Sequence, residues 1–400
     1  MRVFAAPGLS PRGRQLLWGM LIVGAAVRLV VAFTTRGVDA DIEAYEMVWD
    51  AVGEKPLELY SLTTTAFPHW PYPSLFVAWI ALSGGLHDLT GLRFDGLVQI
   101  APIAADLALV WMVQAFLGQR GASETTRLAA AALVALGTSF VFISGYHGQI
   151  DALAILPPIL ALWYWDRAGP ERSAVVAGVL IGVGGAIKFP PLMLLFALLP
   201  TARSIREGAV LISSAAGVVL LSLAPFLLAD FDATSEALRA NKGLPGFGGI
   251  SLVLQPDLAG AWLGTNRTVE MSSLSESLYD RAGPLSGAIV LAAGAVAFWL
   301  RLPPVNAAVL LFLAVYALAA NFAFQYLVAG LVVFLMAGRL RAVAALQLAV
   351  LIPTVILYVH ERRDLALHNV YTPIMIAVWA AFLVALVLYL RQLWQQHQPA

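Results

Sequence analysis

The chain has 400 residues, of which 60% are hydrophobic and only 12% are charged, and its mean hydropathy is +0.81. Its apolar surface exceeds what one soluble core could bury, so the composition predicts an all-α polytopic membrane protein. The formal net charge is zero, and the overall charge therefore indicates neither an acidic nor a basic partner. The absence of cysteine excludes disulfides, thiolate metal sites and a cysteine nucleophile.

The first hydrophobic stretch, Leu16 to Phe33, is long enough to cross a membrane. No small-residue cleavage site follows it, so we expect a retained span rather than a signal peptide. Arg2, Arg12 and Arg14 precede this stretch and predict that the N-terminus lies in the cytoplasm.

The number of spans depends on one hydrophobic segment, residues 72–86. If it spans, the arginine-bearing loops at 118–127 and 166–173 lie outside, against the positive-inside tendency. If it lies in the interface, the arginine loops fall inside and nearly all carboxylates fall outside. The segment is short, begins Tyr-Pro-Ser and contains two glycines, which suits an interfacial helix. We therefore predict twelve spans with both termini inside, near residues 16–34, 96–117, 128–144, 150–165, 174–187, 189–200, 208–229, 284–300, 305–320, 323–337, 342–358 and 371–390.

This topology predicts two long external loops, at residues 35–95 and 230–283. The second is rich in Gly, Pro, Ser and Asn and has no long periodic run, which is typical of a functional or disordered loop. The corresponding division of the chain is a membrane module at 1–230 that includes the first loop, an external loop at 231–283 and further membrane helices at 284–400.

The first loop carries most of the chemistry that the sequence offers. If a helix starts near Asp41, then Asp41 and Tyr45 lie one turn apart on the same side, and Glu43 points away. Capping of that helix is an alternative role for Asp39 or Asp41. The loop contains more acids than capping requires, and a base for a sugar hydroxyl is the natural use of one of them. The carboxylates are Asp39, Asp41, Glu43, Glu46, Asp50, Glu54 and Glu58.

A second cluster lies in S-G-Y-H-G-Q-I-D-A-L, between two hydrophobic segments. His147, Gln149 and Asp151 occupy a tight external turn, and Asp151 enters the next helix. An ionisable residue at membrane depth is costly and indicates function, although His147 or Asp151 could also cap that helix. One His and one Asp form a weak ligand set, so the spacing gives little support to a metal.

Lys188, in A-I-K-F-P-P-L, lies within a hydrophobic run of about 27 residues that contains no other Lys or Arg. One such charge costs on the order of 3 kcal/mol on insertion scales. The two prolines after it predict two short spans that turn outside at Lys188. Its ammonium could bind a lipid phosphate or snorkel to the interface.

Two further groups occur late in the chain. Arg362 and Arg363, with His360, lie in the last external loop, where an arginine pair can clamp a phosphate or form a solvated charge run. Gln325 and Tyr326 are polar groups just inside a span and need partners there.

These elements resemble the GT-C membrane glycosyltransferases, which take a sugar from a polyprenyl phosphate carrier on the non-cytoplasmic side. D-I-E-A-Y is similar to the acidic first-loop motif of the polyprenyl- and dolichyl-phosphate-hexose-dependent enzymes, in which the leading Asp is the base; this position is Asp41. W-P-Y-P-S-L resembles their Y-P-P-L element, with Ser74 in place of the second Pro. I-K-F-P-P and F-Q-Y-L-V are similar to their Lys-Pro and Gln-Tyr elements.

The H-G-Q-I-D turn resembles the family's second external motif and the turn where oligosaccharyltransferases bind metal through a D-x-D pair. Here His147 to Gln149 replaces the first acid, so the resemblance implies a metal-independent enzyme that needs no cofactor. The implied substrate-binding residues are Asp39, Glu43, Tyr45, His69, Tyr72, His147, Gln149, Asp151, Gln325 and Tyr326. The implied donor-phosphate residues are Lys188, Arg362, Arg363 and His360.

The resemblance implies an inverting transferase, with a hexose, mannose by preference, moving from a polyprenyl-phosphate donor to a lipid-linked glycan or glycolipid acceptor. The active site would face the exterior or periplasm of the plasma membrane, and nucleic acid would not be a partner. A lipid or sugar-lipid transporter is the main alternative, since it would use the same cations without a base. A metal-dependent oligosaccharyltransferase-like enzyme and a structural membrane protein are the others.

Overall fold

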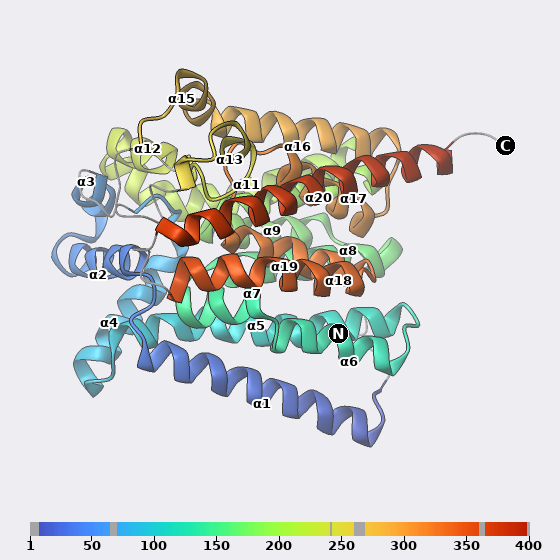
Figure 1. The fold of residues 1–400 in the computed structure, drawn as a ribbon, viewed down its shortest axis with the longest axis horizontal. Helices are drawn as coiled ribbons and strands as arrows, with labels where there is room; N and C mark the ends of the chain where they lie inside the picture. Colours follow the sequence, from blue (N-terminus) through green and yellow to red (C-terminus); the bar gives the residue numbers. More distant parts are fainter. Residues whose placement is uncertain (1–7, 65–69, 241, 260–268, 360–364, 398–400) are drawn as a thin grey trace. The chain divides into compact units, whose positions relative to one another are not determined.

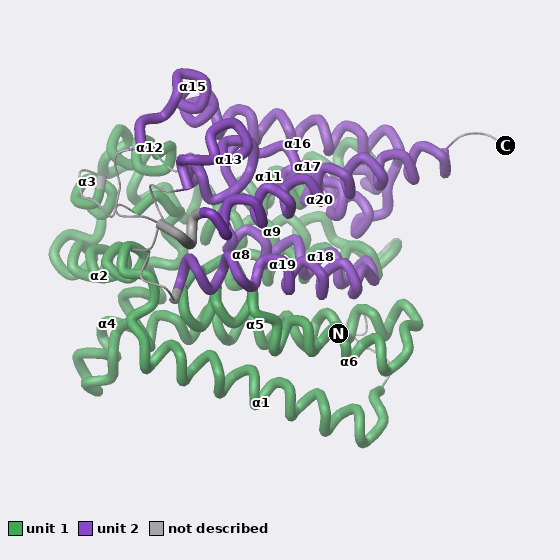
Figure 2. The backbone as a smooth tube through the Cα atoms, in the orientation of Figure 1, with its two compact units in different colours: residues 1–195, 203–241 green, residues 196–202, 242–400 purple. Residues whose placement is uncertain are grey.

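The computed structural model describes residues 8–64, 70–240, 242–259, 269–359 and 365–397, and within these ranges all regular structure is helical (Figure 1). The chain divides into two compact units, shown in Figure 2. Unit 1 comprises residues 1–195 and 203–241, and unit 2 comprises residues 196–202 and 242–400. The all-α prediction is confirmed for the described residues.

Unit 1 is built around long apolar helices that pack side by side. Helix α5 contacts α1, α6 and α8, and α9 packs against both α8 and α11 (Figure 1). The helices and short turns of this bundle are α1 Pro11–Thr34, α5 Phe94–Gln119, α6 Glu124–Ala135, α7 Thr138–Phe140, the π-helix η4 Val141–His147, α8 Asp151–Ala168, η5 Gly169–Glu171, α9 Ala174–Ile187, η6 Pro190–Leu194 and α11 Ile205–Ala229.

The sequence explains why these helices begin and pack as they do. Ser10, Ser123, Ser173 and Ser204 precede α1, α6, α9 and α11, and each hydroxyl accepts a hydrogen bond from a backbone N–H in the first turn. Helix α9 carries glycines on the face toward α11; a Cβ at Gly182 would lie 2.7 Å from a carbonyl oxygen of α11. Small residues therefore allow the α9 and α11 backbones to approach closely, as in other membrane helix pairs.

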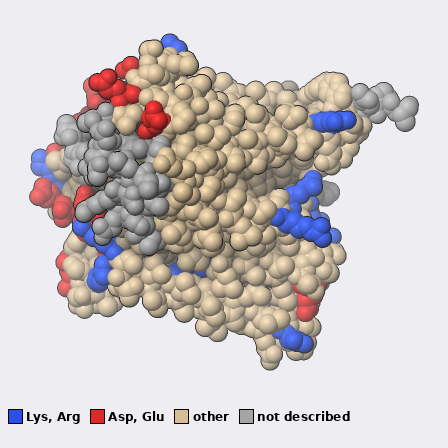
Figure 3. Space-filling model, in the orientation of Figure 1, with Lys and Arg blue, Asp and Glu red and all other residues tan. Residues whose placement is uncertain are grey.

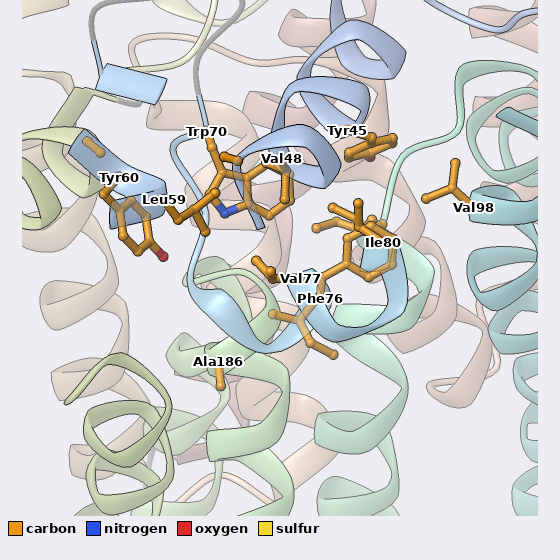
Figure 4. Close-up of a cluster of buried hydrophobic side chains, with 14 of the residues drawn as sticks. Tyr45, Val48, Leu59, Tyr60, Trp70, Phe76, Val77, Ile80, Val98 and Ala186 are labelled. Carbon is orange, nitrogen blue, oxygen red and sulfur yellow. The ribbon is translucent and has the colours of Figure 1, made fainter. Parts of the chain in front are cut away.

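The first long loop is folded rather than open. It contains α2 Asp39–Glu54, η2 Pro56–Glu58, α3 Leu59–Thr64, η3 Ser74–Phe76 and α4 Val77–Thr90. Tyr45, Trp70 and Phe76 are buried in one apolar cluster with side chains of α2, α4 and the bundle (Figure 4). The ring centroids of Tyr45 lie 6.0 Å from Trp70 and 5.6 Å from Phe76. This core fixes α2 on the end of the bundle.

Unit 2 is a second helical bundle. Within it, α17 packs against α16, α18 and α20, and α19 packs against α18 and α20. Its elements are η7 Leu199–Thr201, α13 Ile250–Leu254, α15 Ser273–Asp280, α16 Ala282–Trp299, α17 Pro304–Leu318, η8 Phe324–Tyr326, α18 Leu327–Met336, α19 Leu340–Val359 and α20 Leu365–His397; helix α10 Leu195–Leu198 begins at the boundary of the two units.

Seven of the described helices are long and apolar enough to cross a membrane, and shorter apolar helices accompany them. Most of the face seen in Figure 3 bears neither acidic nor basic side chains, as expected of a surface in lipid. The seven are α1, α5, the run Glu124–His147, α11, α16, and the runs Leu340–Tyr358 and Asn369–His397. The chain is therefore an integral membrane protein with several candidate spans, while the count of twelve stays a prediction.

The expectation of a second long loop without regular structure is wrong for much of its length. Residues 230–283 include α12 Phe231–Ala240, α13 and α15. Helix α12 packs against α3 and α11 within unit 1. Ala237 is buried in the apolar cluster and Leu238 packs against it, but a helix of ten residues is too short for a scan of long hydrophobic periods to detect.

Candidate active site

Helix α2 places Asp41 beside the buried core. Ile42, Tyr45, Val48 and Ala51 recur at helical spacing on its inner face, whereas Glu43 is exposed on the other side. The Asp41 side chain lies at the edge of this face and is 23% exposed. The N-cap residue of α2 is Val38, and no side chain caps the helix. The capping alternative for Asp39 and Asp41 is therefore wrong, and both lie in the first turn.

A π-helical turn brings His147 to Asp41. The segment Val141–His147 is π-helical and ends at Gly148, whose φ of +82° is a left-handed conformation that favours glycine. The Tyr45 hydroxyl donates a hydrogen bond of 3.0 Å to the Gly148 carbonyl and so ties α2 to this turn. His147 Nε2 then hydrogen-bonds the Asp41 carboxylate.

Five side chains form one hydrogen-bonded series, which we call the polar chain: His147, Asp41, Gln149, Lys188 and Asp151. Gln149 hydrogen-bonds Asp41, and its Oε1 accepts a hydrogen bond of 3.3 Å from Lys188 Nζ. Lys188 Nζ also lies 2.8 Å from Asp151 Oδ2. The structure thus brings together five residues that the sequence singles out from three separate segments.

Lys188 is buried instead of reaching the interface. It follows the last residue of α9 in an extended conformation, because Pro190 and Pro191 prevent the helix from continuing. The predicted helix break is therefore confirmed, but the snorkelling alternative is wrong, since the side chain is only 3% exposed. Its ammonium lies 5.1 Å from the centroid of the Tyr72 ring, a cation–π distance.

Asp41 is kept ionised by its neighbours. Burial raises the pKa of Asp41, but the charge of His147, hydrogen bonds from His147 and Gln149 and the charge of Lys188 together hold that pKa below its usual range. Burial raises the pKa of Tyr72 far above its usual value, and the nearby carboxylates add to this shift. Asp41 is therefore a carboxylate, and Tyr72 a neutral phenol, at physiological pH.

The W-P-Y-P-S element forms an aromatic wall beside the polar chain. The Trp70 and Tyr72 ring centroids lie 5.1 Å apart, edge to face. The Tyr60 hydroxyl donates to the Tyr72 carbonyl at 2.8 Å, and the Ser74 hydroxyl donates to a carbonyl of α11. Ser74, which replaces the proline of the similar motif, is thus used as an anchor for this element.

Several predicted site residues do not join the polar chain. Asp39 is 74% exposed and lies 3.9 Å from Arg36, and Glu43 is exposed. Gln325 and Tyr326 belong to unit 2, where the Tyr326 carbonyl accepts a hydrogen bond from Tyr316 at 2.6 Å. The predicted residues outside the described ranges are His69, His360, Arg362 and Arg363.

Sequence reasoning missed a second buried polar group, which we call the inner triad: Arg28, Asp106 and Ser144. Arg28 Nε lies 3.1 Å from both Asp106 Oδ2 and Ser144 Oγ, and the guanidinium also donates to three backbone carbonyls. All three side chains are buried. The sequence did contain a signal for this group. Arg28 and Asp106 are each a lone charge within a predicted span, and lone charges at membrane depth need partners.

The described residues do not fit a metal site. They contain no group of three or more His, Asp or Glu side chains that could hold an ion. The Asp41 carboxylate already accepts bonds from His147 and Gln149, and Asp151 is paired with an ammonium that a cation would have to displace. We therefore derive no step through a metal.

The helices and this polar site define a polytopic membrane protein with a buried group of ionisable side chains in unit 1. The family model of glycosyltransferase family 87 matches residues 70–315, more than half of the chain. The chain belongs to glycosyltransferase family 87, a family of GT-C type membrane glycosyltransferases. The resemblance drawn from the sequence motifs is thereby confirmed at the level of the superfamily, and the protein is a membrane glycosyltransferase.

Among the solved structures to which the chain is similar is an oligosaccharyltransferase. The oligosaccharyltransferase of Archaeoglobus fulgidus, tethered to an acceptor peptide, is 12% identical with a TM-score of 0.40, over 94% of this chain and 55% of that chain. The chain thus spans about half the length of that enzyme. No curated protein matches the chain.

Proposed function

We propose that this protein is an inverting hexosyltransferase. Its donor is a hexose, mannose by preference, on a polyprenyl phosphate carrier, and its acceptor is a hydroxyl of a lipid-linked glycan or glycolipid. Family membership supports transfer of a sugar. The number of spans, the side of the membrane and both substrates are part of the proposal.

The observation that carries this proposal is the position of Asp41. It is the member of the polar chain with the largest exposed fraction, so an acceptor can reach it, while His147 and Gln149 hold its orientation. A general base must be ionised, oriented and accessible to the proton that it takes. Asp39 and Glu43 are also accessible, but among the described residues no hydrogen bond with the polar chain orients them.

In the proposed step, an acceptor hydroxyl binds to Asp41. Its oxygen attacks the anomeric carbon from the face opposite the phosphate, and the bond between that carbon and the phosphate oxygen breaks. The hydroxyl proton goes to Asp41, the electron pair leaves with the polyprenyl phosphate, and the configuration at the anomeric carbon inverts.

Lys188 has a dual role in this proposal. Its contacts with Gln149 and Asp151 order the polar chain. In the proposed step its charge attracts the leaving phosphate. Asp151 offsets much of this charge, so the leaving group needs further cations. Arg362, Arg363 and His360, which lie outside the described residues, are the candidates from the sequence.

The proposed topology has twelve spans, both termini in the cytoplasm and the polar chain facing the exterior or periplasm of the plasma membrane. The seven candidate spans, the four shorter apolar helices and α8 correspond to the twelve hydrophobic segments. Cysteines introduced at the exposed positions Thr125 and Ser273 test it. Labelling of Thr125→Cys from the cytoplasm alone and of Ser273→Cys from outside alone is expected; the reverse pattern would overturn it.

The function is tested with purified protein and a panel of polyprenyl-phosphate hexoses, each with a lipid-linked glycan acceptor. We expect loss of the sugar from one donor, formation of an inverted glycosidic bond and loss of both in Asp41→Asn. Movement of intact donor across a vesicle membrane, unchanged by Asp41→Asn and without sugar loss, would favour a transporter and contradict the proposal.

A further inference from the structure

Unit 2 contains a large cavity, and no residue of the polar chain lines it. Its volume is about 610 Å³, and its lining residues belong to α17, α18, α19, α20 and the turn before α19. This is within the range of about 300–1,000 Å³ that ligand cavities occupy. Its walls are almost entirely apolar, and alanines on α19 and α20 create the space: Ala342, Ala345, Ala349, Ala377, Ala381 and Ala385. We call this cavity the alanine groove.

A second, polar cavity continues the alanine groove at one end. Its volume is about 70 Å³, and it shares Val309, Arg339, Tyr389 and Gln392 with the groove. Amide side chains of α17 and α20 complete its wall. The two cavities together are long and apolar with one compact polar end. This shape matches a ligand that is mostly hydrocarbon and carries a small head.

Arg339 gives the polar end its charge. It lies in the turn between α18 and α19, where Gly338 has a φ of +76°, and its side chain is exposed to the cavity. Among the described residues, no carboxylate forms an ion pair with its guanidinium. An arginine without a carboxylate partner, next to neutral amide and phenol groups, is suited to a phosphate. Basic pockets between transmembrane helices commonly bind anionic lipid head groups.

We infer that unit 2 binds an anionic glycerophospholipid, with its acyl chains in the alanine groove and its phosphate on Arg339. The compact polar cavity favours a small head over a phosphate that carries a hexose. None of the residues proposed for the donor phosphate lines either cavity. Bound lipid would fill the space between α19 and α20 and so stabilise unit 2.

The test compares phosphatidylglycerol with phosphatidylcholine of identical acyl chains, added to the delipidated full-length protein in neutral detergent. Because a ligand that binds only the folded state raises its stability, we expect phosphatidylglycerol to raise the melting temperature by about 3–8 °C and phosphatidylcholine to have a smaller effect. Arg339→Gln should remove the difference. Arg341→Gln, an exposed arginine two positions away that lines neither cavity, should keep it.

A second pair of variants tests the apolar part. Ala381→Trp fills the alanine groove and should reduce retention of phosphatidylglycerol in native mass spectra more than tenfold. Val384→Trp, on an exposed face of α20 outside both cavities, should not. Equal loss in Arg341→Gln and Arg339→Gln, or equal effects of the two lipids, would overturn the inference. Stabilisation through Arg339 by polyprenyl phosphate but not by phosphatidylglycerol would also overturn it, because the groove would then belong to the donor.

Discussion

The inner triad and the polar chain are both buried in unit 1, but they differ in how far their charged side chains are exposed to solvent. The inner triad is sealed: Arg28 and Asp106 are fully buried, and the guanidinium is satisfied by Asp106, Ser144 and backbone carbonyls. The polar chain has one partly exposed member, the Asp41 carboxylate, whose side chain is 23% exposed. Charges that the protein encloses on all sides can stabilise a fold but are out of reach of a substrate. Buried charge alone therefore does not identify an active site. A buried polar group in which one ionisable side chain is exposed to solvent is the better candidate.

The largest expected effect is the loss of catalysis when the partly exposed Asp41 carboxylate is replaced. Asp41→Asn keeps the size and polarity of the side chain but removes the base, so transfer should fall on the order of 10²- to 10⁴-fold. Turnover of the donor measures it, and an unchanged melting temperature shows that the variant is folded. Asp39→Asn is the matched control and should keep most of its activity, since that side chain is exposed outside the polar chain. An inactive Asp39→Asn beside an active Asp41→Asn would reverse the assignment.

The second effect is on stability, in the sealed group. Asp106→Asn leaves the buried Arg28 charge without its carboxylate, which should cost about 3–5 kcal/mol of unfolding free energy. Arg36→Gln removes one member of an exposed pair with Glu46 and should cost less than about 1 kcal/mol. Thermal unfolding in detergent measures both changes. A stable but inactive Asp106→Asn would mean that the triad, too, belongs to the chemistry.

A smaller effect concerns pH. In the wild type, contacts with His147 offset burial and keep the pKa of Asp41 low, so its ionised form persists as the pH falls. His147→Gln removes that charge and leaves the burial, so the pKa of Asp41 should rise. The acid limb of kcat/KM should therefore move to higher pH, with activity lost earlier on acidification. Gln395→Glu, at an exposed position of α20 that lines neither cavity, serves as a control and should leave the limb in place; an unshifted limb in His147→Gln would contradict the coupling.

The smallest expected effect is that of chelation. The residues of the polar chain use their carboxylates on His147, Gln149 and Lys188, so donor turnover should continue in excess EDTA. Assays with and without chelator at equal ionic strength measure it. Loss of turnover that Mn²⁺ or Mg²⁺ restores would show that Asp151 exchanges Lys188 for a metal when substrate binds.

Local spacing predicted part of the site correctly. The four-residue interval between Asp41 and Tyr45 puts both on one side of α2, and Glu43 lies on the other, as expected. The prolines after Lys188 end α9 where predicted. These features depend on backbone geometry within a few residues, which the sequence specifies directly.

Contacts between distant segments could not be predicted in the same way. His147 and Asp41 are 106 positions apart, and their contact depends on how the core around Trp70 seats α2 on the bundle. Lys188 pairs with Asp151 and does not snorkel, although snorkelling was one of the two expected outcomes. The Asp151 carboxylate, in a neighbouring helix, offsets the desolvation cost of burying the Lys188 ammonium. Periodicity shows which face of a helix is buried but not which helix covers it.

The π-helical turn Val141–His147 also has a consequence for alignments of this family. Its hydrogen bonds skip one more residue than those of an α-helix, so one extra position is accommodated before Gly148. Removing a single residue there would rotate the following side chain by about 100° around the helix axis and take the imidazole away from the carboxylate. Relatives whose sequences are shorter by one in this turn should therefore present a different side chain to the acid, and aligning them by hydrophobic period alone would equate the wrong positions.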